Sequence, residues 1–473
     1  MSDARRESPP PPPPDVPTPG PAPVVPGAVH RVVVGPRDER GRGTGTLGRR
    51  ELRLPNALPG ETLDARLVHI GRTVAEARIE KVVAASPDRV PDGCFHGAEC
   101  PGCGLRTTAP GARRAFLRDR VAKALAAEGL AQVPVLETVA APDEDGWRHK
   151  AYLTARRTKR GIFLGLYEEH SHRLLGIEGC PAHAAPVERA LAAVRQALRR
   201  VDPPIYDERS REGWLRYVTV RAALADGSAL VTLVTASRAF APERALADEI
   251  RRIDKDVSGI VVNVHEGAGN TPFGARFVPI AGNPFLFEAT GPFRVRVSAG
   301  SFFQVNPAVG SRLHDGVAAA ARTAPPGPAA DLYGGVGCTA LRLAADGRPV
   351  TLVEAPGPAA DDARWNVRSI PEPGALVDVR PERVETAIEA DGFPVPTVVV
   401  ANPPRSGLSA PVLDRIRRWK PALLVYVACD PRPLARDLAA FAADGALIES
   451  VEPYELMPQT SHVEALAIVR RPP

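Results

Sequence analysis

The sequence predicts an α/β protein with a C-terminal doubly wound domain, preceded by a small β-barrel and a central α+β domain. Short β-like runs separated by Gly and Pro occupy residues 28–88, and mixed helical and strand patterns follow over 89–285. A repeated strand–helix–strand pattern fills residues 286–473, which is typical of a parallel sheet covered by helices. A chain of 473 residues is long enough for these domains.

Residues 1–27 are predicted to form a separate tail. They are dominated by Pro, including the unbroken run Pro9–Pro14, and offer no apolar face to bury. We therefore expect a disordered, partly polyproline segment, which also lacks the apolar core of a signal peptide. No apolar run of the chain reaches membrane length, and the net charge of +5 mildly favours a polyanionic partner.

The barrel prediction rests on runs of strand-forming residues bounded by turn residues. Four or five short strands within one such region suggest a small barrel. The clearest runs are Arg31–Val34, Glu51–Leu54, Thr62–Val68 and Val74–Ile79.

The central region is marked by clustered cysteines. Cys94, Cys100 and Cys103 lie within ten residues, and Cys180 follows between Gly and Pro. Soft thiolates select iron–sulfur clusters or zinc. Zinc is the main alternative, although a zinc ribbon brings its ligands as two close pairs. The C-x5-C-x2-C spacing differs from the C-x3-C-x2-C of radical-generating clusters, and buried free thiols or disulfides are the remaining alternative.

Three further elements are predicted in the central region. Ala115–Leu125 has helical periodicity, and Leu215–Thr235 reads as a hairpin with its turn at Asp226–Gly227. Trp147–Leu166 reads as strands with many cationic side chains, which could hold phosphates on a sheet face or could simply be solvated. These are Arg148, His149, Lys150, Arg156, Arg157, Lys159 and Arg160.

The C-terminal domain is predicted from short apolar runs, as expected for central parallel strands. They are Ala329–Tyr333, Thr351–Glu354, Thr397–Ala401 and Leu423–Val427. An Asp-x-x-x-Gly-x-Gly turn begins at Asp331, and Glu354 ends the second strand, where it can bind two ribose hydroxyls. The turn would equally suit a dinucleotide, but the third glycine of that signature is missing, which favours S-adenosylmethionine.

Two further segments lie where such sheets carry chemistry. Asn402-Pro403-Pro404 would indicate amino-group methylation of a flipped base if an aromatic residue followed, but Arg405 takes that place. Cys429 ends the next strand, at the carboxyl edge of the sheet, and could be a nucleophile or a packed core thiol.

Together these residues resemble the RNA uracil-5-methyltransferase family, in its TRAM-domain, iron–sulfur branch, over about Val29–Arg470. Several motifs occur in the family's order. They are Ser301–Pro307, Asp331–Gly337, Asn402–Gly407, Cys429–Pro431, Leu434–Leu438 and His462–Glu464.

The resemblance implies a Rossmann-like methyltransferase domain, an OB-like TRAM barrel that binds RNA, and a central iron–sulfur domain. It implies that a [4Fe–4S] cluster is held by Cys94, Cys100, Cys103 and Cys180. Cys429 would be the nucleophile that adds to carbon 6 of a uridine, and Glu464 would be the base. Residues at cofactor-contact positions are Gln304, Tyr333, Glu354, Asp378 and Asn402.

The sequence departs from the family pattern at several positions. Asn402 stands for Asp, Gly334 for Cys, Ala428 and Asp430 for Ser and Asn, and Pro101 for Gly. Asp430 is expected to raise the pKa of the neighbouring thiol by charge repulsion. These departures motivate one alternative, a non-catalytic RNA-binding relative.

The resemblance also implies the partners. We expect a cytoplasmic monomer that acts on RNA, with no DNA or membrane partner. The barrel and the cysteines favour 23S rRNA by family analogy, and tRNA is the alternative.

Overall fold

The computed structural model describes residues 24–168, 171, 173–238, 242–267 and 271–471. Residues 1–23 of the predicted Pro-rich tail lie outside this range. The chain forms two compact units. The first ends at Pro87 and excludes residues 39–41. The second comprises residues 39–41 and the chain from Asp88 onward. No described helix is long and apolar enough to cross a membrane.

The first unit is a five-stranded sheet with the order β1-β4-β5-β3-β2. Its strands are β1 (Val29–Val33), β2 (Gly43–Leu47), β3 (Arg50–Leu54), β4 (Thr62–Ile70) and β5 (Val74–Ala84). The segment after β1 bonds to β2, since Gly35 N donates to Thr44 O at 2.7 Å and Thr44 N donates to Pro36 O at 3.1 Å. These bonds join the two outer strands of the sheet. That the unit is a TRAM barrel stays a prediction.

The second unit contains a seven-stranded sheet from the central region, with the order β12-β11-β10-β9-β6-β7-β8. The predicted hairpin is confirmed, because β9 and β10 pair antiparallel around residues 223–228. The strands are β6 (Lys150–Thr158), β7 (Gly161–Tyr167), β8 (Leu174–Gly176), β9 (Leu215–Ala222), β10 (Ala229–Thr235), β11 (Val257–Val264) and β12 (Arg276–Gly282).

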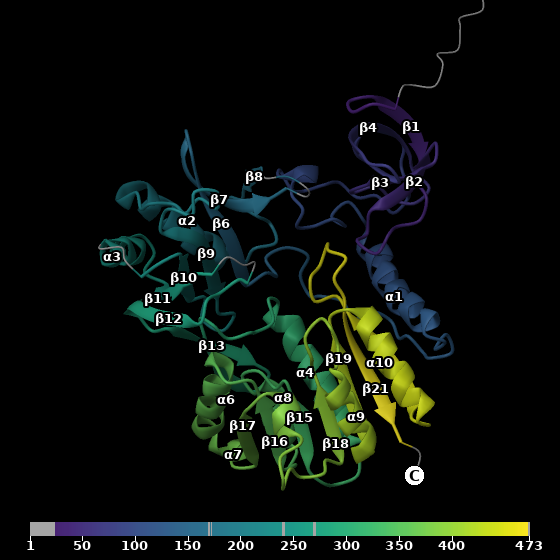
Figure 1. The fold of residues 1–473 in the computed structure, drawn as a ribbon, viewed down its shortest axis with the longest axis vertical. Helices are drawn as coiled ribbons and strands as arrows, with labels where there is room; N and C mark the ends of the chain where they lie inside the picture. The colour runs from purple at the N-terminus through teal and green to yellow at the C-terminus, as the bar shows by residue number, and fades with distance from the viewer. Residues whose placement is uncertain (1–23, 169–170, 172, 239–241, 268–270, 472–473) are drawn as a thin grey trace, which may run out of the picture. The chain divides into compact units, whose positions relative to one another are not determined.

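Helices α2 (Ala185–Val201) and α3 (Glu243–Ile253) cover one face of this sheet (Figure 1). Ala151, Leu153 and Ala155 of β6 are buried in the cluster that these helices complete. Because successive strand side chains point to opposite faces, the even-numbered residues of β6, from Lys150 to Arg156, lie on the other face.

A second seven-stranded sheet forms the C-terminal part, with the order β17-β16-β15-β18-β19-β21-β20. Strands β15 to β19 are parallel, and β21 is antiparallel to both β19 and β20. The strands are β15 (Ala329–Leu332), β16 (Val350–Glu354), β17 (Val377–Pro381), β18 (Val398–Ala401), β19 (Leu423–Ala428), β20 (Leu447–Tyr454) and β21 (Glu464–Arg470). The order reverses between β15 and β18, where doubly wound sheets bind ligands. The predicted α/β fold of this part is therefore confirmed.

Short elements surround this sheet. The hairpin β13 (Phe285–Thr290) and β14 (Phe293–Ser298) precedes it. In the central region, a 3-10 turn, Gly97–Glu99, lies among the cysteines. The helices are α4 (Pro307–Arg322), α5 (Cys338–Ala345), α6 (Pro358–Ser369), α7 (Pro371–Gly374), α8 (Val384–Ala387), α9 (Ala410–Trp419) and α10 (Pro431–Ala443).

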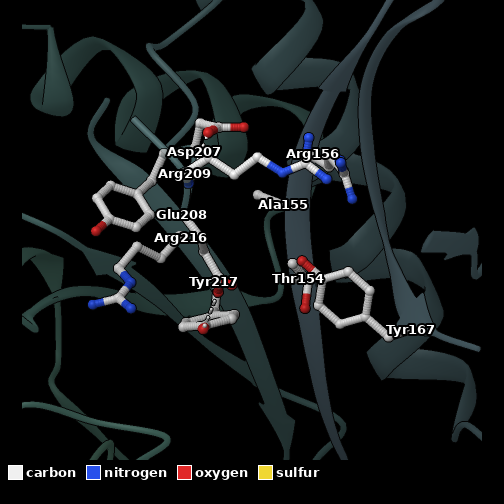
Figure 2. Close-up of a pocket in the computed structure, with 10 residues that line it drawn as sticks. Thr154, Ala155, Arg156, Tyr167, Asp207, Glu208, Arg209, Arg216 and Tyr217 are labelled. Carbon is white, nitrogen blue, oxygen red and sulfur yellow. Dashed lines mark hydrogen bonds between the residues drawn. The ribbon is translucent and has the colours of Figure 1, made fainter. Parts of the chain in front are cut away.

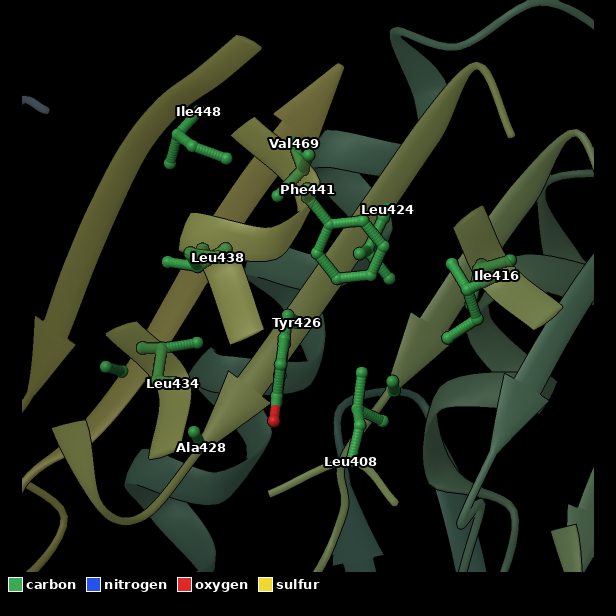
Figure 3. Close-up of a cluster of buried hydrophobic side chains, with 14 of the residues drawn as sticks. Leu408, Ile416, Leu424, Tyr426, Ala428, Leu434, Leu438, Phe441, Ile448 and Val469 are labelled. Carbon is green, nitrogen blue, oxygen red and sulfur yellow. The ribbon is translucent and has the colours of Figure 1, made fainter. Parts of the chain in front are cut away.

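An apolar cluster between β19 and α10 supports the segment that carries Cys429. Figure 3 shows Leu424 and Tyr426 of the strand facing Leu434, Leu438 and Phe441 of the helix. All five side chains are buried, so the end of β19 is held firmly against α10.

Helix α1 (Pro110–Ala127) belongs to this same cluster, although its sequence lies in the central region. Its buried face, Leu117, Val121 and Leu125, packs with the side chains of β19 and α10, and Figure 1 shows α1 beside α10. The central and C-terminal regions therefore share a core. The predicted boundary at residue 285 stays a prediction.

Candidate active site

A cavity of about 810 Å³ lies at the carboxyl ends of β15, β16, β18 and β19. This edge of a doubly wound sheet is its usual binding site. The cavity brings together six of the seven predicted residues of the C-terminal domain. These are Gln304, Tyr333, Glu354, Asn402, Cys429 and Glu464.

The structure places Asp378, the seventh predicted residue, outside the cavity lining. It is the second residue of β17, its side chain is 64% exposed, and it accepts a hydrogen bond from Arg380 Nε at 3.1 Å. Residues Arg383, Val384 and Glu385, which follow the strand, line the cavity instead. Ligand contacts in this fold come from beyond the strand ends, which a mid-strand residue does not reach.

The turn after β15 holds the acid of the neighbouring strand. Tyr333, Gly335 and Gly337 all have left-handed backbones, with φ of 61°, 57° and 95°. This path points Gly335 N at Glu354, and it donates to Oε2 at 3.0 Å. Burial raises the pKa of Glu354, and the N–H groups of Gly335 and Ala355 oppose that rise. The turn thus fixes this carboxylate at the cavity wall.

The structure gives a reason for Gly334, where the resembled family has cysteine. A Cβ atom at this position would lie 2.6 Å from Leu352 Cγ and 3.1 Å from Asp331 Oδ2. Asp331 is itself buried, and burial raises its pKa to about 7. In this chain, any side chain at position 334 would require Leu352 to move.

Cys429 and Glu464 come from different strands and interact electrostatically in the cavity. Burial raises the pKa of Glu464 to about 7, and the charge of Arg405 opposes this. Burial also raises the pKa of the Cys429 thiol, Glu464 raises it further, and Arg405 lowers it. The expected effect of Asp430 is confirmed in direction, but it is the smallest contribution. Asp430 also caps α10 by accepting a bond from Arg432 N at 3.0 Å.

Arg405 is the functional candidate that the sequence interpretation missed. It lines the cavity, and its positive charge acts on Cys429, Glu464 and His462. Its loop is anchored because Leu408 N donates to the buried Asp437 at 2.9 Å. A cation directly after Asn-Pro-Pro, at the carboxyl end of a predicted strand, was the available signal.

The segment before β21, residues 457–463, is bound by residues that follow the clustered cysteines of the central region. Leu105 N donates to Gln459 O at 2.9 Å, and Arg106 Nη1 donates to Gln459 Oε1 at 2.8 Å. Arg120 of α1 donates to Ser461 O. Leu105, Arg106 and Arg120 therefore position the segment that brings His462 and Glu464 to the cavity.

The four predicted cluster ligands lie on two adjacent segments. A ring nitrogen of His96 lies 3.0 Å from Glu178 O, which places residues 94–103 beside residues 178–180. Burial raises the pKa of Cys103 to about 12, and the charge of Cys180 raises it further. Cys100 and Cys180 are likewise raised by burial, and all six cysteines are free thiols.

No metal-binding arrangement of three or more His, Cys, Asp or Glu side chains is found among the described residues. The four thiols are nevertheless of the right type and lie near one another. Buried thiolates repel each other, which a positively charged iron–sulfur core would relieve. The residues present therefore fit such a cluster chemically, and the cluster stays a prediction.

Comparison with known proteins decides the family. Residues 289–471 match the family described as tRNA (Uracil-5-)-methyltransferase. A protein of Geobacter sulfurreducens named an uncharacterized RNA methyltransferase is 31% identical over 443 residues, which covers 91% of this chain and 88% of that protein. A Gloeobacter violaceus protein of the same description is 31% identical over 425 residues, covering 89% and 92%. The chain belongs to the family of these RNA methyltransferases.

A solved structure supports the fold assignment for this family member. The Pyrococcus abyssi tRNA (uracil-54, C5)-methyltransferase, in complex with S-adenosyl-L-homocysteine, superposes with a TM-score of 0.72 at 24% identity. The match covers 93% of this chain and 99% of that one. The relatives and the family match, rather than this structure, confirm the prediction of an RNA methyltransferase and disfavour the non-catalytic alternative.

Because its pKa is raised, Glu464 should make stability depend on pH. The folded state prefers the protonated acid, so its stabilising contribution is full below about pH 4.5 and is lost as pH rises through about 7. Glu464→Gln should therefore gain stability relative to wild type between pH 5 and 8.5, by up to about 3 kcal/mol at 1.36 kcal/mol per pKa unit. Thermal unfolding at several pH values measures this. Glu128→Gln is the control, because Glu128 is exposed. A difference in unfolding temperature between Glu464→Gln and wild type that stays constant with pH would contradict the prediction.

Proposed function

We propose that this enzyme transfers a methyl group from S-adenosylmethionine to carbon 5 of a uridine in RNA. The observation that carries the proposal is the convergence of a thiol, Cys429, and a buried acid, Glu464, on one cavity at the ligand-binding edge of the sheet. The family assignment supplies the class of reaction. The cavity supplies the groups that this reaction needs.

The cofactor half of the cavity is assigned to the turn after β15 and the ends of β16 and β18. Glu354 would bind the ribose hydroxyls, since its carboxylate is fixed by Gly335 N. Tyr333, Gln304 and Asn402 line the same region and would complete the contacts. S-Adenosylmethionine supplies the methyl group when bound.

The chemistry follows from the weak nucleophilicity of carbon 5. The Cys429 thiolate adds to carbon 6 and pushes electrons into the ring, which makes carbon 5 nucleophilic toward the methyl group. The Glu464 carboxylate then accepts the carbon 5 proton. The carbon 6–sulfur bond breaks, the double bond returns, and the thiolate is released.

The electrostatics of the cavity suit this sequence of steps. Arg405 favours the anionic forms of both Cys429 and Glu464, against the burial that disfavours them. A base with a pKa of about 7 is partly ionised at neutral pH and still basic enough to take a proton. We assign Arg405 the role of balancing the two negative groups.

The RNA substrate is proposed to be 23S rRNA. The support is the resemblance to the branch with an N-terminal barrel and four cysteines. A tRNA substrate is the second candidate, because the matching family is described by tRNA methylation. In both cases the target base must leave its stack to reach the cavity.

Mass spectrometry of RNA from a deletion strain tests the function and the substrate together. Loss of 5-methyluridine from one site in 23S rRNA, restored by the purified enzyme, is the expected result. Loss from tRNA instead would assign the second candidate. Unchanged 5-methyluridine in both RNA classes would contradict the proposal.

We also propose that the four cysteines hold a [4Fe–4S] cluster that braces the central region. Protein purified without oxygen should be brown and contain about four irons per chain. Cys180→Ser should lose the colour and lower the thermal stability, since this ligand joins two segments distant in sequence. Cys338→Ser is the control, because Cys338 lies in the separate cluster around α5. Colourless protein with stoichiometric zinc would contradict the proposal.

The ribose assignment predicts the effect of Glu354→Ala. S-Adenosylmethionine binding should weaken by about 1.5–3 kcal/mol, the scale of lost hydrogen bonds to a charged group. Calorimetric titration measures this. Asn402→Asp, which restores the family residue, should leave binding intact or improve it. Unchanged affinity in Glu354→Ala would move the ribose site elsewhere.

A further inference from the structure

A second cavity, of about 260 Å³, lies in the central sheet, far along the chain from the catalytic residues. It opens on the sheet face that α2 and α3 do not cover. Thr154 and Arg156 of β6 and Tyr217 of β9 line it from the sheet, and Asp207, Glu208 and Arg209 line it from the neighbouring loop (Figure 2). None of its lining residues belongs to the cavity that contains Cys429.

Aromatic rings line this cavity and continue across the sheet face beyond it. Tyr167 and Tyr217 lie on either side of Thr154 in Figure 2. The ring centroids of Tyr217 and Tyr152 are 5.0 Å apart, and Tyr152 is 6.4 Å from Phe273. Partly exposed rings on an open sheet face are the usual platform on which single-stranded RNA stacks its bases.

Two guanidinium groups meet at the rim. Figure 2 shows the Arg209 side chain extending toward Arg156. The pKa of Asp207 is lowered first by N–H bonds from Ser210 and Arg209, and then by the charges of Arg156 and Arg209. The lining also contains the carboxylate of Glu208 and the guanidinium group of Arg216. Three guanidinium groups therefore face two carboxylates, which leaves one positive charge in excess, suited to a phosphate.

A third arginine is a fixed part of the wall. Arg216 is buried, and its Nη1 donates to His265 Nδ1 at 2.8 Å and to the carbonyl oxygens of His265 and Gly267, both at 2.9 Å. Its guanidinium also lies 4.6 Å from the ring centroid of Tyr206. These contacts hold the wall of the cavity in place before any ligand binds.

Strand β6 connects this cavity to the catalytic one. Directly before the strand, His149 N donates to Val305 O at 2.7 Å, and Val305 lines the catalytic cavity. Thr154 lies five residues further on, which is about 17 Å along a strand. Lys150, between them, lies 5.3 Å from the ring centroid of Phe273. Lys150 and Tyr152 of β6, both beside Phe273, thus lie along the strand between the two cavities.

We propose that this second cavity binds one unpaired nucleotide of the substrate RNA, a few nucleotides away from the methylated uridine. The base stacks on Tyr167 or Tyr217, and the phosphate lies at Arg156 and Arg209. The RNA substrate is taken from the proposed function, so the inference rests on it. The cavity would help select the RNA and would take no part in the chemical steps.

Photo-crosslinking tests the position of the base. The probe is a single-stranded RNA of mixed sequence, about 12 nucleotides long, within the range of such sites, with 4-thiouridine in place of uridine. Irradiation followed by peptide mass spectrometry should find crosslinks at Tyr167 or Tyr217. Crosslinks confined to the catalytic cavity and the first unit would overturn the proposal.

Affinity measurements on matched variants test the contribution of the cavity. The double variant Tyr167→Ala with Tyr217→Ala, and the single variant Arg209→Glu, should each weaken binding of the same probe, and loss of one base–aromatic stack corresponds to roughly 5- to 150-fold. Arg211→Glu is the control, because Arg211 lies in the same loop but outside the lining. Unchanged thermal unfolding and S-adenosylhomocysteine affinity show that the variants are folded. Variants that bind within twofold of wild type would overturn the proposal.

Methyl transfer by the wild type separates this inference from the proposed function. If wild type methylates RNA while both variants bind like wild type, only the inference on the second cavity fails. If the probe crosslinks at Tyr167 or Tyr217 but no uridine is ever methylated, the proposed function fails and the RNA site stands.

Discussion

Cys429→Ala should abolish methyl transfer, with a loss of at least about 10⁴-fold in turnover. Without the thiol no bond forms at carbon 6, and carbon 5 stays too weak a nucleophile to accept a methyl group. The variant should still bind RNA, because the thiol is a small part of the contact surface. Transfer of radiolabelled methyl groups to RNA, together with an RNA-binding assay, measures both properties.

Glu464→Gln should fail at a later step. The thiol can still add and the methyl group can still transfer, but no carboxylate accepts the carbon 5 proton, so the thiol cannot leave. A protein–RNA species that survives denaturation should accumulate. Wild type should be trapped in the same way by RNA that contains 5-fluorouridine, since fluorine does not leave as a proton does.

The controls for these variants come from the same chain. Cys338→Ala removes a buried thiol outside the catalytic cavity and should keep full activity. Turnover by Cys429→Ala would exclude the covalent mechanism. The covalent mechanism would also be excluded if the enzyme methylates uridine RNA but never becomes attached to RNA that contains 5-fluorouridine.

The sequence predicted the parts of the site that depend on strand ends. Apolar runs located β15, β16, β18 and β19, and in a parallel sheet the residues after such strands meet at one edge. Glu354, Asn402 and Cys429 were found in this way, and all three line one cavity. Glu464 was found through its motif at the start of β21.

The remaining features depend on contacts between distant segments. The sequence could not show that Asp378 lies outside the cavity. Strand β17 is a partly exposed edge strand without a clear apolar run, so its end could not be located from the sequence. The role of Arg405 depends on how Asp437 holds its loop. The packing of α1 against α10 brings residues more than three hundred positions apart together, and no local periodicity encodes such a contact.

One of these long-range contacts should be among the most important for stability. Arg113 of α1 is buried, and its Nε donates to the equally buried Glu455 at 2.5 Å. Its Nη2 also donates to the Glu144 carboxylate, at 2.6 and 2.7 Å. Glu455 directly precedes the segment that carries His462 and Glu464, so the pair links α1 to the catalytic cavity.

Arg113→Ala should destabilise the protein by about 3–5 kcal/mol, the cost of leaving one charge of a buried pair without its partner. Removing both charges, as in the double variant Arg113→Met with Glu455→Leu, should recover much of this loss because no buried charge remains. Arg118→Ala on the same helix breaks only the exposed pair with Glu137 and should cost about 1 kcal/mol or less. Urea unfolding midpoints of the four proteins measure these differences. If Arg113→Ala unfolds at the same urea concentration as Arg118→Ala, the buried pair does not stabilise the link between α1 and the cavity.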